Sequence, residues 1–234
     1  MIYFLRKNSS ILRLGKTKFE GKVLIKATSN GLSEFMTNIS MSIVAILFNF
    51  QLMKYSGENG VAAYGVMMYV SMIFTAVFVG FSIGASPVIS FHFGAKNTDE
   101  LKNLIRKSIV IVGTFGIIMV IAAEIFAGGL AKIFVGYDEE LYRLTLSGFR
   151  IFALSFGFMG FGILTSGLFT ALNDGLTSAL ISFLRTLVFE SGAVMLLPLI
   201  FGIHGIWYSV VVSEFLALVL GAVFLVINRK KYHY

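Results

Sequence analysis

The 234-residue sequence contains no cysteine, only two prolines and few charged residues. The lack of cysteine excludes disulfide bonds, thiolate catalysis and cysteine-based metal sites. Charged residues make up 13% of the chain, whereas a soluble domain of this size carries about 25%. A surface with so little charge is unsuited to water, so much of it must face lipid.

Signatures of nucleotide-driven chemistry are also missing. The chain has no Walker A loop and no Gly-x-Gly-x-x-Gly segment, and no two histidines have the spacing of metal ligands. We therefore expect no enzymatic activity, no metal site and no cofactor. Without a nucleotide site, any pumping must be driven by an ion gradient.

What the sequence does contain is a series of six long apolar stretches. A helix needs about 20 apolar residues to cross the bilayer core, so the sequence predicts six membrane-spanning helices. They cover residues 32–53, 62–90, 108–135, 146–172, 176–201 and 203–227. The fifth and sixth nearly touch, and we expect residues 201–205 to form the turn because Gly202 and Gly205 relax the backbone there.

Basic residues gather on one side of these spans. Fourteen of the nineteen lysines and arginines lie before the first span, after the second span or in the tail. The positive-inside rule therefore predicts a multi-pass protein of the cell membrane with both ends in the cytoplasm. Because the net charge of +7 lies at span ends, it indicates a lipid bilayer and not nucleic acid as the partner.

The expected organisation has three parts. Residues 1–30 form a cytoplasmic amphipathic linker, since apolar and basic residues alternate there without the apolar core of a signal peptide; a partner-binding linker is the alternative. Residues 31–228 form the six-helix transmembrane lobe, and residues 229–234 form a basic cytoplasmic tail.

Polar residues recur along the first span. Glu34, Asn38, Ser42 and Asn49 follow one another at spacings of 4, 4 and 7, and at about 100° per residue they form one narrow stripe. Such a stripe should face a cleft or an aqueous cavity. We therefore predict Asn38, Ser42 and Asn49 as cleft residues and Glu34 as an ion-coupling residue. The alternative for Glu34 is helix capping near the interface.

Four further ionisable residues lie within the later spans. Arg150 is a further candidate for the cleft, and the only charged one. Alternatively, its side chain extends to the lipid headgroups. Arg185 is expected to be a structural anchor between helices. Glu190 and Glu214 are ion-coupling candidates, because a buried glutamate must be protonated or paired. In an α-helix Arg185 and Glu190 would lie about 140° apart and would not pair.

Residues 79–97 resemble a family signature. They read Val-Gly-Phe-Ser-Ile-Gly-Ala-Ser-Pro-Val-Ile-Ser-Phe-His-Phe-Gly-Ala-Lys-Asn. This resembles the glycine-rich helix, helix-ending proline and Gly-Ala-Lys loop of the multidrug and toxic compound extrusion (MATE) transporters, with Pro87 and Gly94 as structural anchors. Three further segments resemble the bacterial MepA-like branch of that family. Residues 31–35 resemble the entry to its seventh helix, and residues 184–186 with Pro198 resemble its eleventh helix. Residues 202–207 with Ser213 and Glu214 resemble the junction between its eleventh and twelfth helices.

The resemblance implies an all-α integral membrane protein whose six transmembrane helices form one lobe of a MATE-like twelve-helix transporter. It matches the C-terminal half, so a missing N-terminal six-helix lobe or a second copy is the implied partner. The family exchanges organic cations and amphipathic small molecules for Na+ or H+ through a cleft between the lobes. One branch couples ions through a glutamate in its seventh helix and an aspartate in its tenth. Here Met41 and its neighbours replace the first, and the fourth span has no acidic residue.

Two alternatives remain open. The first is a flippase for lipid-linked oligosaccharides from the same superfamily, which would need basic residues in a central cavity. Only Arg150 and Arg185 are available within the spans. The second is a truncated lobe that does not transport.

Overall fold

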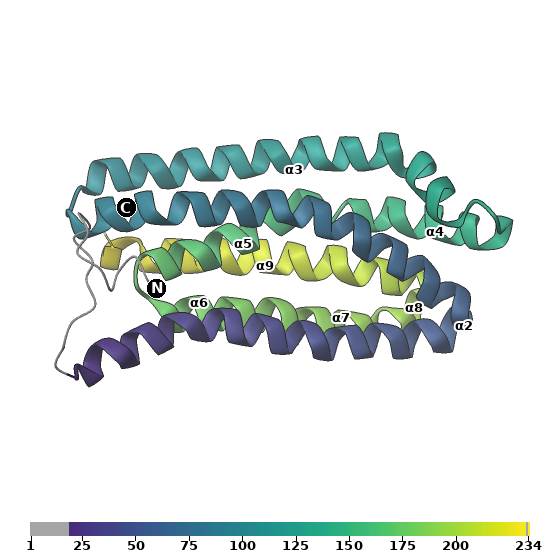
Figure 1. Ribbon diagram of the computed structural model, residues 1–234, viewed down its shortest axis with the longest axis horizontal. Helices are drawn as coiled ribbons and strands as arrows, with labels where there is room; N and C mark the ends of the chain where they lie inside the picture. Colours follow the sequence, from purple (N-terminus) through teal and green to yellow (C-terminus); the bar gives the residue numbers. More distant parts are fainter. Residues whose placement is uncertain (1–18, 233) are drawn as a thin grey trace, which may run out of the picture.

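The computed structural model describes residues 19–232 and 234, and within them every regular element is a helix. In chain order these are α2 (Gly21–Gly94), α3 (Thr98–Val135), α4 (Glu139–Ala153), α5 (Phe156–Ala171), α6 (Gly175–Ser182), the π-helix η1 (Phe183–Glu190), α7 (Ser191–Leu196), α8 (Pro198–Phe201) and α9 (Ile203–Tyr232). They run side by side in a single elongated bundle (Figure 1). Most of the predicted linker lies outside the described residues, but residues 21–30 already continue the helix of the first span.

Helix α2 is a hairpin of two limbs, residues 21–56 and 58–94. Figure 1 shows the first limb running to one end of the bundle and the second limb turning back from there, with the two limbs diverging away from the turn. The reversal occurs at Gly57, whose φ of 60° and ψ of −150° lie outside the helical region. Only glycine adopts these angles readily, because it has no Cβ.

The chain therefore crosses the bundle six times, as the sequence predicts. Within the described residues, four helices are long and apolar enough to span a membrane, or five if α4 and α5 form one span bent by 49°. One of the four is the 61-residue stretch Glu34–Gly94, which the turn at Gly57 divides into two crossings. The turn between α8 and α9 also falls where expected, with Gly202 at a φ of 56°.

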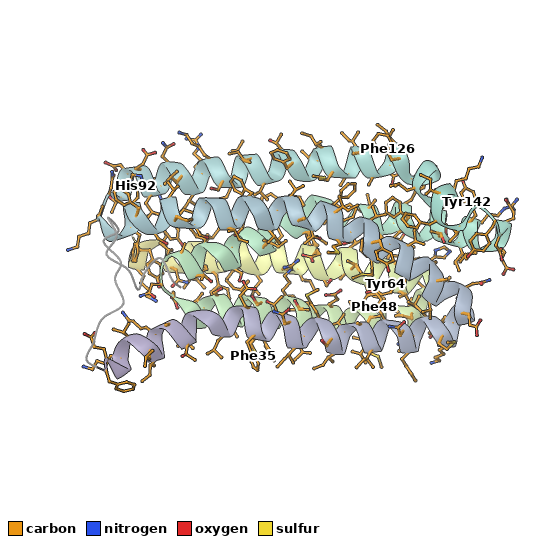
Figure 2. All side chains as sticks on the ribbon, in the orientation of Figure 1. Phe35, Phe48, Tyr64, His92, Phe126 and Tyr142 are labelled. Atoms are coloured by element: carbon orange, nitrogen blue, oxygen red, sulfur yellow. The ribbon has the colours of Figure 1, made fainter. Side chains whose placement is uncertain are left out.

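Aromatic side chains fill the half of the core nearer the Gly57 turn. Phe48 and Tyr64, from the two limbs of α2, stack with ring centroids 4.8 Å apart. Figure 2 shows this pair inside the bundle, whereas Phe35 and Phe126 point away from it. Trp207 of α9 is fully buried. The exposed apolar side chains elsewhere on the surface are those of a protein solvated by lipid.

The opposite end of the bundle, here called the basic end, contains the start of α2, the α2–α3 and α5–α6 turns, and the end of α9. Asp174 caps α6 by accepting a hydrogen bond from the Thr177 backbone N–H. It also accepts from Lys231, with Nζ 2.9 Å from Oδ2, and from the Tyr232 hydroxyl. Partial burial acts to raise the Asp174 pKa, but these hydrogen bonds outweigh it and lower the pKa to about 2. The carboxylate thus ties the end of α9 to the α5–α6 turn.

The two prolines both lie inside the membrane-spanning part. The helix-ending role that the resemblance implies for Pro87 is wrong, because α2 continues past this residue to Gly94. The helix ends there, since Lys96 has a positive φ of 57°. Pro198 begins α8, within the fifth span.

Pro198 creates a hydrogen-bonding problem that Gln51 solves. Proline has no N–H for the carbonyl four residues earlier, so the Val194 carbonyl lacks its helical donor. The buried Gln51 side chain, on the first limb of α2, donates from Nε2 to this oxygen at 3.1 Å. In lipid an unpaired carbonyl is costly, and this contact therefore joins the first and fifth spans.

We predict that Gln51→Leu lowers the free energy of unfolding by about 1 kcal/mol. In a Pro198→Ala background residue 198 regains an N–H for the Val194 carbonyl, so the same substitution should cost much less. Reversible unfolding in mixed detergent micelles measures all four proteins of this double-mutant cycle. An equal cost of Gln51→Leu in both backgrounds would show that the Val194 carbonyl does not need Gln51.

Candidate functional site

The fifth span changes its helical form in the middle of the bundle. Residues 183–190 form the π-helix η1, between α6 and α7. In a π-helix the hydrogen bonds run between residues five apart, and such segments are frequent at functional sites. Arg185 and Glu190 are five residues apart, so η1 places them one turn from each other. The separation expected from an α-helix therefore does not apply to them.

Arg185 and Glu214 form an ion pair between the fifth and sixth spans. The guanidinium donates two hydrogen bonds, from Nε to Oε2 at 3.0 Å and from Nη2 to Oε1 at 2.6 Å. The two side chains are 18% and 7% exposed. This two-point geometry suits the planar guanidinium, and it satisfies both charges away from water.

Gly162 of α5 provides the space that Arg185 occupies. A Cβ at this position would lie 3.0 Å from both Cδ and Nε of Arg185. A Cβ at this position would therefore require the Arg185 side chain to shift by a few tenths of an ångström. The arginine therefore crosses directly over the α5 backbone on its way to α9.

The same face of α5 continues as a network of hydroxyl groups. The Ser166 hydroxyl lies 2.9 Å from those of Ser178 and Ser182 on α6. The Thr170 hydroxyl lies 2.8 Å from that of Ser178. Small polar residues allow close packing of membrane helices, so this network fixes the segment that leads into η1.

Glu190 is the third ionisable group of the site. It is half-buried and close enough to Glu214 and Arg185 to interact electrostatically with both. It also interacts electrostatically with the buried Tyr64 phenol of the second limb of α2. Among the described residues, no hydrogen bond or ion pair engages its carboxylate. The Arg185–Glu214–Glu190 cluster thus holds two carboxylates and one cation.

The polar stripe of the first span lies on the surface of the lobe, apart from this cluster. Glu34, Asn38, Ser42 and Asn49 are all exposed. Asn38, Ser42 and Asn49 each donate to the backbone carbonyl four residues earlier in their own helix. Their assignment to a substrate cleft stays a prediction, and so does the ion-coupling role of Glu34.

Arg150 is also apart from the cluster. It lies at the lobe's surface with Nε 3.8 Å from Oε2 of Glu124 on α3. The pair is exposed, so solvent and lipid headgroups share its charge. Its predicted part in a cleft therefore stays a prediction as well.

One segment matches the sequence pattern of an enzyme, but its structure does not have the geometry that the enzyme needs. Residues 80–84 read Gly-Phe-Ser-Ile-Gly, the Gly-x-Ser-x-Gly pattern of many hydrolases. That chemistry requires a strand-to-helix turn that exposes the serine. Here Ser82 is buried within the second limb of α2, and no elbow forms. The described residues also contain no group of three or more His, Cys, Asp or Glu side chains able to hold a metal ion.

Sequence reasoning missed Gln51, Tyr64 and Gly162. Pro198 is a usable signal for Gln51, because a proline within a span leaves a carbonyl that needs a donor. No local sequence feature indicates the roles of Gly162 and Tyr64. Their contribution depends on packing between helices that are far apart in the chain.

A bundle of long apolar helices that crosses itself six times, with ionisable groups enclosed between its spans, is the fold of an integral membrane protein. The MatE family profile matches residues 35–194, more than half of the chain. The chain therefore belongs to the MatE family, whose members are membrane transporters and not enzymes.

Two relatives agree with this assignment. The chain is 22% identical over 218 residues to the multidrug export protein MepA of Staphylococcus aureus (strain bovine RF122 / ET3-1), covering 92% of this chain and 47% of MepA. It is 27% identical over 149 residues to the probable multidrug resistance protein YoeA of Bacillus subtilis (strain 168), covering 61% of this chain and 32% of YoeA.

A solved structure supports the fold. The crystal structure of MATE in complex with MaL6 matches with a TM-score of 0.88 at 22% identity, over 99% of this chain and 53% of that chain. The chain thus spans about half the length of the relatives that it matches, as expected for one lobe.

Removing Arg185 should destabilise the lobe more than removing Glu214. Breaking a buried ion pair costs about 3–5 kcal/mol. After Glu214→Gln, Glu190 still neutralises Arg185, whereas after Arg185→Gln two carboxylates repel each other. We expect the Arg185→Gln variant to be the less stable one by about 1 kcal/mol or more, measured by unfolding in mixed micelles.

The matched control is Glu124→Gln, which removes an exposed ion pair and should change stability by about 0–1 kcal/mol. If the Glu214→Gln variant were as unstable as the Arg185→Gln variant, Glu190 would not interact with Arg185 and would not belong to the cluster.

Proposed function

We propose that the chain is the C-terminal half of a secondary active multidrug antiporter, which exchanges organic cations or amphipathic compounds for Na+ or H+. The observation that carries the proposal is the Arg185–Glu214–Glu190 cluster, which contains one carboxylate more than it has cations. In a low-dielectric surrounding, an ionised carboxylate without a counter-charge costs several kcal/mol. The cluster therefore favours uptake of one small cation.

Glu190 is the group that takes up this cation. Glu214 is already engaged by both hydrogen bonds from Arg185, while Glu190 is half-buried and near the Tyr64 phenol. A proton or a sodium ion at Glu190 would neutralise the cluster. Its release would then be linked to movement of the fifth span, whose middle is the π-helical segment η1.

The transporter also requires a second lobe. The N-terminal six-helix half of a MepA-like protein would supply it, with a second copy of this chain as the alternative. The exposed stripe of Asn38, Ser42 and Asn49 then forms one wall of the cleft between the lobes. In the cell membrane the basic end faces the cytoplasm, in accordance with the positive-inside rule.

The pairing of the arginines within the spans disfavours the flippase alternative. A pyrophosphate group needs basic side chains free to bind it. Among the described residues, both arginines within the spans have carboxylate partners, Glu124 for Arg150 and Glu214 for Arg185. A flippase would alter the turnover of lipid-linked precursors, and a truncated lobe would change neither drug accumulation nor precursor turnover.

Co-expression with the first six helices of MepA should lower the accumulation of ethidium in cells. In that assembly Glu190→Gln should reduce ion-driven exchange at least tenfold, which corresponds to about 1.4 kcal/mol. Glu124→Gln is the matched control and should leave exchange unchanged, because its carboxylate lies at the surface. Glu34→Gln tests the other candidate in the same assay.

Unchanged ethidium accumulation, with both halves confirmed in the membrane, would contradict the antiporter. An active assembly in which Glu190→Gln retains its full dependence on pH and sodium would instead contradict the coupling role alone.

A further inference from the structure

A groove opens on the surface of the bundle between α3 and α9. Both helices pack against α5, which forms the floor. The groove has a volume of about 310 Å³ and is lined mainly by aliphatic side chains. Ile105 and Ile109 lie on one wall, Leu218 and Leu225 on the other, and Leu164 on the floor.

The groove lies toward the basic end of the bundle. Its lining residues on α3 come within the first turns after Thr98, and those on α9 extend from Leu218, in the middle of that helix, toward its end at Leu225. Lys102 lies one helical turn before Ile105, and Arg229 lies one turn beyond Leu225. Both basic side chains are exposed. Because residues three or four apart share a helix face, Lys102 and Arg229 lie on the same faces of α3 and α9 as the groove walls, beyond the lining residues.

The nearby charges are predominantly positive. Asp99 and Glu100 lie in the first turn of α3, and Glu100 accepts from Asn103 at 3.3 Å. Arg229 donates from Nε to the Tyr234 carbonyl at 3.2 Å. Lys231 is paired with Asp174. Lys102, Arg106, Lys107, Arg229 and Lys230 outnumber the two acidic residues.

We propose that an anionic phospholipid binds here, with one acyl chain in the groove and its phosphate between Lys102 and Arg229. The groove matches both parts of such a lipid. Its apolar lining suits the acyl chain, and the two cations lie where the headgroup would be. An acyl chain moves from one apolar surrounding to another when it enters the groove, so burial alone gives little selectivity. The headgroup supplies it, because basic pockets between spans attract anionic lipids.

The proposal does not depend on transport, and the isolated full chain in vesicles tests it. Ile109→Trp places a fluorophore in the groove wall, and Ile117→Trp places one on the exposed surface of the same helix. The only native tryptophan, Trp207, is fully buried and gives the background. Dibrominated phosphatidylglycerol or dibrominated phosphatidylcholine is then added as the quencher to phosphatidylcholine vesicles.

We expect phosphatidylglycerol to half-quench the Ile109→Trp reporter at a mole fraction at least threefold lower than phosphatidylcholine does. The Ile117→Trp reporter should respond equally to both lipids. Adding Lys102→Gln and Arg229→Gln should abolish the preference. Adding Lys22→Gln and Lys26→Gln, which removes two charges from the basic end on the first limb of α2, should preserve it.

Equal quenching of the Ile109→Trp reporter by both lipids would overturn the proposal, as would its failure to be quenched by either. An equal loss of preference in the Lys22 and Lys26 control would also overturn it, because the net charge of the basic end would then account for the effect without a site in the groove.

Discussion

The ion pair between Arg185 and Glu214 is the constraint on which the centre of this lobe depends. A guanidinium inside a membrane bundle must be neutralised and fully hydrogen-bonded, and both oxygens of Glu214 meet that need. Gly162 of α5 leaves room for this pair, because a Cβ there would lie 3.0 Å from both Cδ and Nε of Arg185. The pair holds η1 against α9, and η1 brings Glu190 to the same place. The π-helix η1, the glycine at position 162 and the additional carboxyl group of Glu190 are thus parts of one arrangement.

Other interactions adapt the surrounding helices to this centre. Gln51 pairs with the carbonyl freed by Pro198, and Asp174 ties the end of α9 to the α5–α6 turn. The fifth span is therefore held near both of its ends while its middle is π-helical. The lobe also has two kinds of surface: a polar stripe on the first limb of α2, and an apolar groove between α3 and α9 that ends in basic residues. These surfaces suit a protein neighbour and a lipid neighbour, respectively.

Much of the fold could be predicted from the sequence, because the length of an apolar run determines whether it crosses a bilayer. The six crossings and the turn at Gly202 follow from that rule. Residues 79–97 indicated the family only together with the other motifs, by their order and spacing along the chain. The site could not be predicted to the same depth. Assuming an α-helix placed Arg185 and Glu190 on different faces, and no local pattern announces a π-helix. Pro87 was misread because neighbouring spans allow a proline inside a membrane helix. The roles of Gln51 and Gly162 arise from contacts between distant segments, which a single sequence does not reveal.

The central claim is that Glu190 carries the cation that substrate displaces. The most direct test counts the protons and sodium ions released when ethidium binds to the assembled two-lobe protein, using a pH-indicator dye and a sodium electrode. The account predicts that Glu190→Gln releases one cation fewer than the parent protein, while Glu124→Gln releases the same number. An unchanged count in Glu190→Gln, with ethidium still bound, would contradict the account.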